Sequence, residues 1–147
     1  MEIPLKKNVR INQIITKSDI GLITKIKDVD YIGTGYFFVR KDQAPQSFIS
    51  AVNRLDDIRK LAPTNFMAKI STNYDDYKIS EKDVKYGTVK DGKVIFETEI
   101  RKIGLNYKFY SYFKKQLKVE FRFSDSLIPV GMFKDKKFIG VLMPVKL

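Results

Sequence analysis

The 147-residue chain contains no cysteine and no histidine. Without cysteine it can form no disulfide, no thiolate metal site and no cysteine nucleophile. Without histidine it lacks the commonest general base of enzymes and the commonest metal ligand. We therefore predict a protein that is not an enzyme and that holds no cofactor and no metal. The missing cysteine also suits a reducing compartment such as the cytoplasm.

Long apolar runs are missing as well. No stretch approaches the roughly 18 apolar residues that a membrane helix needs, and the N-terminus has no apolar run of signal-peptide length. We expect a soluble, cytoplasmic protein with no membrane partner.

Motifs for nucleotide and metal chemistry are also missing. The chain has no phosphate-binding G-x-x-x-x-G-K-[ST] loop, and Gly33-Thr34-Gly35 is too short for a dinucleotide fingerprint. The carboxylates of Asp56-Asp57 would point in different directions on a helix. Those of Asp75-Asp76 lie in a polar stretch with no third acidic residue nearby. We interpret both pairs as solvated surface rather than as a Mg²⁺ site.

Basic residues are in clear excess. The chain has 28 lysines and arginines against 17 acidic residues, a formal net charge of +11. The excess is spread evenly, with 12 basic and 7 acidic residues in the first 74 positions and 16 and 10 in the rest. Such a surface favours polyanions through counterion release and long-range steering. A high isoelectric point shared with a lysine-rich proteome is the alternative explanation.

Apolar periodicity predicts strands interrupted by two helices. The first helix should open at Pro45, carry an apolar stripe and end before Pro63. The second should run from Asn106, a good N-cap residue, through Lys115. Asp91-Gly92 between alternating stretches predicts a tight hairpin, since both turn positions favour positive φ. The expected strands are 20–27, 31–40, 65–72, 77–79, 84–88, 94–100, 119–123, 128–133 and 138–145, with a further one around 9–15.

This order of elements predicts the α+β class, with a mostly antiparallel sheet and two helices packed on one face. We expect a single domain over residues 1–147, in which residues 1–45 form N-terminal strands or an extension. Residues 46–147 would form its main part.

Aromatic residues are densest from Tyr107 to Phe113, beside several lysines. Phe109, Tyr112 and Phe113 fall at helical spacing, which indicates core packing. Tyr107 and Tyr110 are less constrained, and aromatic rings among cations can stack single-stranded bases. A module that binds single-stranded nucleic acid is therefore one alternative function.

The C-terminal sequence Val141-Leu142-Met143-Pro144-Val145-Lys146-Leu147 closely resembles the terminal V-x-M-P-[MV]-[RK]-[LI] of the bacterial DNA polymerase III beta subunit, the sliding clamp. The segment from Lys102 to Phe109 is similar to the clamp's I-G-F-N-x-x-Y. After it, segments 117–123, 124–126 and 128–147 resemble clamp segments in the same order and at similar spacing. Upstream, 48–54 is similar to the first helix of the clamp module, and 33–39 is more weakly similar to a clamp strand. The resemblance covers about one module, over residues 46–147 and best over 102–147, whereas a clamp chain carries three.

The resemblance implies a clamp-like, DNA-associated accessory protein of replication or of a phage or mobile element. Clamp modules place two helices toward duplex phosphate, and one module alone must associate with copies or partners to form a ring. The implied DNA-binding residues are Arg54, Lys60, Lys108, Lys114 and Lys115. In the family the terminal strand also lines a pocket for peptides of replication proteins; the matching positions are Thr34, Gly35, Tyr36, Val141, Met143 and Pro144. An interaction or inhibitory module that uses this pocket without DNA is the second alternative.

Overall fold

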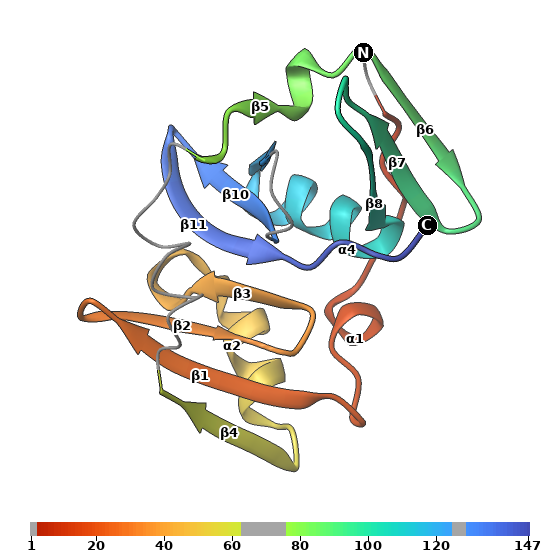
Figure 1. Cartoon of the computed structure of the whole chain (residues 1–147). Coiled ribbons are helices and arrows are strands. Elements are labelled where there is room, and N and C mark those ends of the chain that lie inside the picture. The colour runs from red at the N-terminus through yellow and green to blue at the C-terminus, as the bar shows by residue number, and fades with distance from the viewer. Residues whose placement is uncertain (1–2, 63–75, 125–128) are drawn as a thin grey trace.

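The computed structural model describes residues 3–62, 76–124 and 129–147 and confirms the α+β class (Figure 1). Three α-helices and two mostly antiparallel sheets make up these ranges. The elements before the first gap are α1 (Ile11–Ile14), β1 (Ile20–Ile26), β2 (Val29–Gly33), β3 (Phe37–Arg40), η1 (Lys41–Gln43), α2 (Gln46–Asn53) and β4 (Asp57–Leu61). The later ones are β5 (Ile79–Ser80), η3 (Glu81–Asp83), β6 (Tyr86–Lys90), β7 (Lys93–Glu97), β8 (Lys102–Asn106), α4 (Tyr107–Tyr112), the π-helical turn η4 (Phe113–Leu117), β9 (Glu120–Phe123), β10 (Val130–Lys134) and β11 (Lys137–Leu142).

The larger sheet has eight strands in the order β4-β1-β2-β3-β11-β10-β9-β5. It joins two sequence-distant halves, because β11 pairs antiparallel with β3 and so adds β10, β9 and β5 to the N-terminal strands. Among the described strands only β1 and β4 pair in parallel. The smaller sheet, β6-β7-β8, leads directly into α4.

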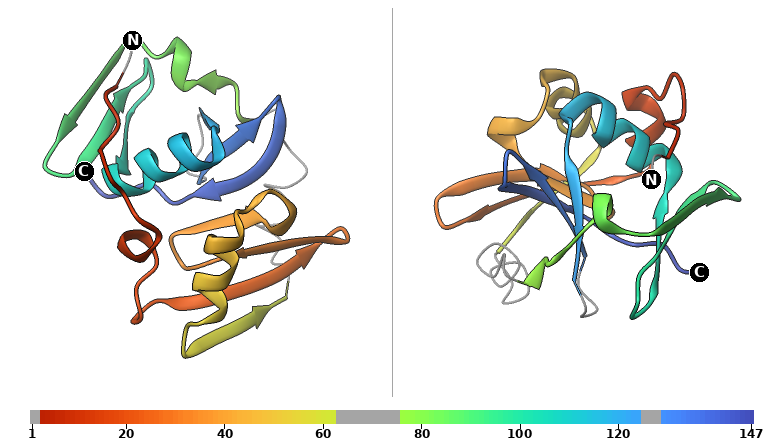
Figure 2. Two further views of the ribbon diagram at one scale, coloured as in Figure 1. Left: turned by 180° about the vertical axis from the view of Figure 1, so that it is seen from behind. Right: turned by 90° about the horizontal axis from the view of Figure 1, so that it is seen from above.

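Helices α1, α2 and α4 lie together on one face of the larger sheet (Figure 2). We call residues 3–18, 46–54 and 107–118, which carry these helices and the segments next to them, the helical layer. Its inner side is aromatic: the Phe37 ring of β3 lies 5.7 Å from Phe48 of α2 and 5.1 Å from Phe113 of η4. All three side chains are fully buried, so the predicted packing of two helices on one sheet face is present.

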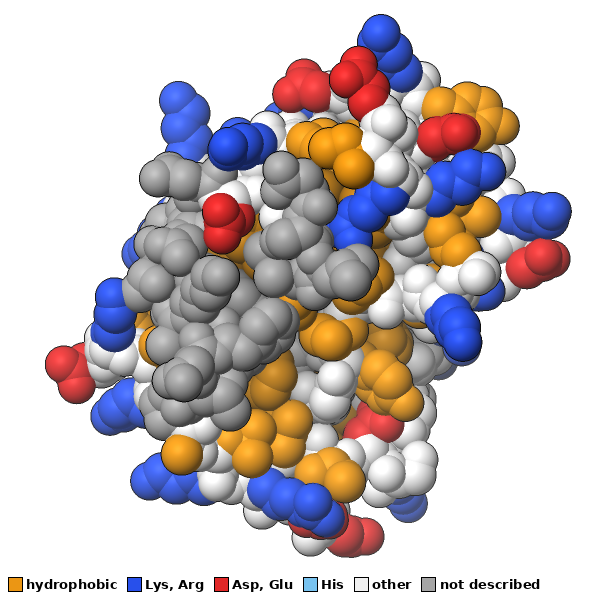
Figure 3. All heavy atoms as spheres, viewed as in Figure 1, with side chains coloured by type: hydrophobic (Ala, Val, Ile, Leu, Met, Phe, Trp, Pro, Cys, Tyr) orange, Lys and Arg blue, Asp and Glu red, His pale blue; other side chains and the backbone are white. Residues whose placement is uncertain are grey.

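The opposite face of the sheet has a second, smaller apolar cluster. It consists of Ile26, Tyr31, Tyr77, Phe133, Phe138 and Val141. The Tyr77 hydroxyl donates to the Pro129 carbonyl over 2.9 Å, which satisfies its only buried polar group. Figure 3 views the molecule from this side, where hydrophobic, basic and acidic side chains all reach the surface.

The first predicted helix is too long. It ends at Asn53, and the remainder of the expected stretch forms strand β4. Parallel pairing with β1 gives this stretch interstrand hydrogen bonds, and the Thr24 hydroxyl donates to the Leu61 carbonyl over 3.0 Å. Side chains of α2, β4 and the segment between them can lie close to β1 because Gly21 has no side chain. A Cβ at Gly21 would lie 3.2–3.3 Å from Val52, Leu55 and Ile58.

The N-terminal segment also differs from the prediction. The stretch expected as a strand around 9–15 contains the short helix α1 instead. Before it, the chain runs along α4: the Lys6 amide donates to the Ser111 hydroxyl over 2.9 Å, and the Tyr107 hydroxyl donates to the Pro4 carbonyl. Ser111 is therefore buried under this segment.

The locally encoded elements are confirmed. Asp91 and Gly92 have φ of 54° and 75° in the turn between β6 and β7. The Asn106 side chain caps α4 by accepting from the Phe109 amide over 3.1 Å. The predicted strand after the second helix and the last hairpin correspond to β9, β10 and β11. The strand expected at 65–72 lies outside the described residues.

Candidate functional site

The helical layer is basic without any acidic residue. Its three segments contain nine lysines and arginines and no aspartate or glutamate, although the whole chain has 17 acidic residues. Eight of the nine are exposed: Lys6, Lys7, Arg10, Lys17, Arg54, Lys108, Lys115 and Lys118. The outer positions of α2 are neutral polar residues, so they contribute no negative charge between these cations.

Three of the five cations expected at a DNA surface lie on this layer and are exposed. Arg54 follows α2, Lys108 lies in the first turn of α4, and Lys115 lies in η4. Lys60 was placed on the first helix incorrectly, because that residue belongs to the edge strand β4. Lys114 also lies in the layer, but its ammonium group forms an ion pair with the buried carboxylate of Glu81.

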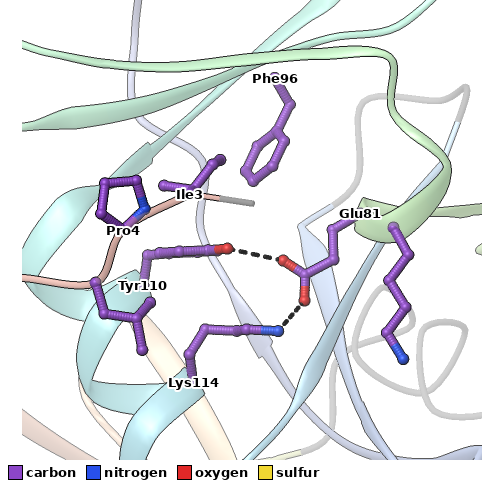
Figure 4. Close-up of a pocket in the computed structure, with 8 residues that line it drawn as sticks. Ile3, Pro4, Glu81, Phe96, Tyr110 and Lys114 are labelled. Atoms are coloured by element: carbon purple, nitrogen blue, oxygen red, sulfur yellow. Dashed lines mark hydrogen bonds and ion pairs between the residues drawn. The ribbon is translucent and has the colours of Figure 1, made fainter. Parts of the chain in front are cut away.

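Glu81 of η3 is the centre of a buried polar cluster between η3, α4 and β9 (Figure 4). Its side chain is 6% exposed. One carboxylate oxygen accepts from the Tyr110 hydroxyl over 3.0 Å. The other accepts from the Lys114 ammonium group and from the Phe121 amide, the latter over 3.3 Å. Lys114 also donates to the Val119 carbonyl over 3.1 Å, so it ties the end of the helix to this cluster.

Tyr110 is buried in this cluster, with an exposed fraction of 4%. Its ring stacks on Phe121 at 5.2 Å and lies 5.8 Å from Phe96. The ring is therefore not available to stack a nucleic-acid base. Tyr107 is half-buried and its hydroxyl is bonded to Pro4, while Phe109, Tyr112 and Phe113 pack in or against the core as expected.

Burial raises the pKa of Tyr110 well above the ordinary value, and the neighbouring Glu81 charge adds to this. Burial likewise raises the pKa of Tyr77, with a smaller contribution from Asp76. Both phenols bind their protons more tightly folded than unfolded. Their contribution to stability is thus complete below the unfolded pKa of about 10 and is lost as the pH rises above it.

We expect the free energy of unfolding to fall steeply above about pH 10. The check is chemical denaturation across alkaline pH, with tyrosinate absorbance followed in parallel. In a Tyr77→Phe, Tyr110→Phe variant the slope above this pH should be shallower. An equal slope in the variant and the parent would contradict this assignment.

The predicted pocket residues are brought to one place by the pairing of β3 with β11. The Met143 amide donates to the Tyr36 carbonyl over 2.9 Å. Thr34 and Val141 are buried, however, and Val141 belongs to the cluster on the face away from the helices. The accessible part of this site is therefore Gly35, Tyr36, Met143 and Pro144. Tyr36 also lies 5.8 Å from Phe109 of α4.

Several residues of the basic surface were not predicted from the sequence. Lys6, Lys7, Arg10 and Lys17 belong to it because the N-terminal segment lies along the helices. Their signal in the sequence was a run of residues with cations and no acid, but nothing local placed that run beside α4. Glu81 had no visible signal, because its partners are 29 to 40 positions away.

The structure also describes the positions of most of the acidic residues that the sequence singled out. Asp56 and Asp57 are exposed, and Asp57 pairs with Arg59 at 3.0 Å; Asp75 lies outside the described residues. Over residues 3–62, 76–124 and 129–147, no group of three or more acidic side chains is arranged to hold a metal ion. No helix in the described part of the chain has the length and apolar character needed to cross a membrane.

Comparison of the chain with protein-family models, with curated proteins and with solved structures gave no match.

Proposed function

We propose that the protein is a clamp-like accessory protein that holds duplex DNA by its phosphate backbone, with the helical layer as the DNA-facing surface. The observation that carries this proposal is the composition of that layer: nine basic residues, no acidic residue, and eight cations exposed. Phosphate contacts need positioned cations and no base-edge chemistry, so binding would be independent of sequence.

The sequence resemblance to the sliding clamp supports the same surface. In that family, two helices on one sheet face are directed at the duplex, and here α2 and α4 lie on one face with Arg54, Lys108 and Lys115 exposed. Lys60 is therefore removed from the proposed DNA-facing residues. Lys114 is removed as well, because its charge is paired with Glu81. The proposed set gains the exposed cations Lys6, Lys7, Arg10, Lys17 and Lys118.

Two sheet edges at opposite ends of the molecule support assembly into a ring (Figure 1). Among the described strands, β4 lies at one edge with Ile58 and Leu61 exposed, and β6 lies at another with Tyr86 and Val89 exposed. Head-to-tail contact between unlike edges generates a closed ring when the rotation between copies allows it. We therefore expect a homo-oligomer, which gel filtration or sedimentation can detect.

The test of DNA binding is the salt dependence of affinity for a labelled duplex, measured by fluorescence anisotropy. Each phosphate contact contributes about 0.9 to the slope of log affinity against log salt. An Arg54→Gln, Lys108→Gln, Lys115→Gln variant should therefore lower the magnitude of that slope by about 2 to 3. The affinity should fall alike for unrelated duplex sequences, because phosphates are the same in each.

The matched control is Lys25→Gln, Lys27→Gln, Lys90→Gln, which removes the same charge from exposed positions outside the helical layer. This variant should retain most of the slope. Equal losses in the two variants would mean that net charge alone is responsible. A strict monomer with no duplex affinity at low salt would contradict the proposal as a whole.

The second candidate function is a protein-interaction module that uses the terminal strand to bind replication proteins. It is favoured by the exposed side chains of Tyr36 and Met143, which are 54% and 40% exposed on adjacent strand ends. Such a surface would bind its partner without help from the helical-layer cations. The triple helical-layer variant would then leave partner binding unchanged.

A further inference from the structure

Two hollows meet at the end of α4 where Glu81 and Lys114 pair. The larger has a volume of about 580 Å³ and lies between the N-terminal segment, η3, β7 and α4 (Figure 4). The second has a volume of about 460 Å³ and lies between η3, the end of the helix and the β10–β11 turn. Lys82 and Lys114 line both hollows, so these residues form the boundary that the two share.

The larger hollow is lined by apolar and polar side chains in equal number. Its apolar lining residues are Ile3, Pro4 and Leu5 of the N-terminal segment and the buried Phe96 of β7. Its polar groups are the Glu81–Tyr110–Lys114 cluster and Lys82. The Glu81 oxygen that faces Tyr110 accepts one hydrogen bond in the structure, and a carboxylate oxygen can accept two. A ring with an amino group would find both apolar side chains and an acceptor here.

The second hollow has an uncompensated positive charge. Lys82, Lys118 and Lys136 are exposed around it, whereas Asp135 is the one exposed acid among its lining residues. Its other acid, Glu120, accepts from the Ser80 hydroxyl and lies 3.6 Å from Arg122. Although burial raises the pKa of Glu120, the Ser80 hydrogen bond and the Arg122 and Lys82 charges lower it overall. The surplus cations therefore suit a multiply charged anion.

Lys114 is held in place between the two hollows. Its ammonium group has three N–H donors, and two of them are directed at Glu81 and at the Val119 carbonyl. The side chain is 24% exposed, and these two bonds leave one donor for a ligand. A lysine fixed at the boundary of the two hollows can bind the oxygen that links a nucleoside to its phosphate.

We propose that the paired hollows bind a nucleoside 5′-phosphate, with the nucleoside in the larger hollow and the phosphates beside Lys82, Lys114, Lys118 and Lys136. Both volumes fall within the range of about 300–1,000 Å³ typical of small-ligand sites. The ligand is either a free nucleotide or the 5′ end of a nucleic-acid strand, since both present the same chemistry. The site shares Lys114 and Lys118 with the helical layer, whereas Lys82 and Lys136 belong to the site alone.

The test is isothermal titration calorimetry of the full chain with ADP at low ionic strength. A Lys82→Gln, Lys136→Gln variant should bind ADP about tenfold more weakly, the loss expected from two charge-assisted contacts. A Lys90→Gln, Lys146→Gln variant, which removes the same charge from exposed positions elsewhere, should bind like the parent. Adenosine and pyrophosphate should each bind at least about tenfold more weakly than ADP, because each fills one hollow only.

The role of the larger hollow is tested by Leu5→Ser. Leu5 is 37% exposed, so this change can be made without disturbing the core. This variant should bind ADP more weakly than the parent and bind pyrophosphate with unchanged affinity. Displacement of ADP by a 5′-phosphorylated oligonucleotide, but not by its 5′-hydroxyl form, assigns the ligand to a strand end. Displacement by neither assigns it to a free nucleotide.

Three results would overturn the proposal: no ADP binding, equal ADP affinity in the two lysine variants, or pyrophosphate binding as tight as ADP binding. The lysine variant changes Lys82 and Lys136, neither of which belongs to the helical layer. Affinity for a 5′-hydroxyl duplex, measured on the same variants, reports the DNA-binding surface separately.

Discussion

Replacement of Glu81 by alanine is expected to lower the free energy of unfolding by about 3–5 kcal/mol, the cost typical of breaking a buried ion pair from one side. The carboxylate accepts from Tyr110, Lys114 and the Phe121 amide, and its removal leaves all three donors without this acceptor. Lys114 would be the most costly, because a cation in a partly buried site then has no counter-charge. Urea denaturation of the parent and the variant measures the difference.

A matched set of variants separates lost packing from lost charge pairing. Glu81→Gln keeps the shape and one acceptor, so its destabilisation should be smaller. The triple change Glu81→Leu, Tyr110→Phe, Lys114→Met replaces the cluster by apolar side chains and should recover part of the lost stability, because it removes the unpaired charge and hydroxyl but still leaves the Phe121 amide and the Val119 carbonyl without these partners. A loss below about 1 kcal/mol for Glu81→Ala would show that the cluster is solvated rather than buried.

Replacement of Gly140 by alanine is expected to cost about 3 kcal/mol or more, at the upper end of the range for overpacking. Gly140 lies in β11 opposite Val39 of β3. A Cβ at this position would lie 2.1 Å from the Phe38 carbonyl oxygen and 3.1 Å from the Val39 Cα. These are backbone atoms of the paired strand, so relief requires the two strands to move apart at the junction between the two halves of the sheet.

Gly35→Ala is the matched control, since a Cβ there has no atom within 4 Å. It should be neutral or should stabilise the fold by about 0.4–1 kcal/mol through a less disordered unfolded chain. Thermal and urea unfolding of the two variants compare the same chemical change in strand β11 and in the turn between β2 and β3. Equal stability of the two would mean that β3 and β11 are not paired as described.

Elements specified by neighbouring residues were predictable from the sequence. The Asp91-Gly92 hairpin follows from two positions that need positive φ, and the start of α4 follows from the Asn106 cap. The aromatic spacing in α4 also identified Tyr112 and Phe113 as core residues. These rules act over a few positions, so the rest of the fold does not change their outcome.

Elements specified by distant partners were not predictable. Residues 57–61 continue a helical apolar pattern, yet they form β4 because β1 has a free edge there and Gly21 allows a close approach. The candidate site follows the same distinction. Lys108 and Lys115 could be placed by helical periodicity, whereas the pairing of Lys114 depends on Glu81, 33 positions earlier in the chain.

The position of β11 has a consequence for synthesis. This strand lies between β3 and β10, so β3 has no partner on its second edge until residues 137–142 have left the ribosome. Throughout the translation of the intervening sequence, β1, β2 and β3 can pair with one another while that edge stays open to other chains. The large sheet therefore cannot close until β11 has emerged, and this delay lengthens the time for which the nascent chain is exposed to aggregation.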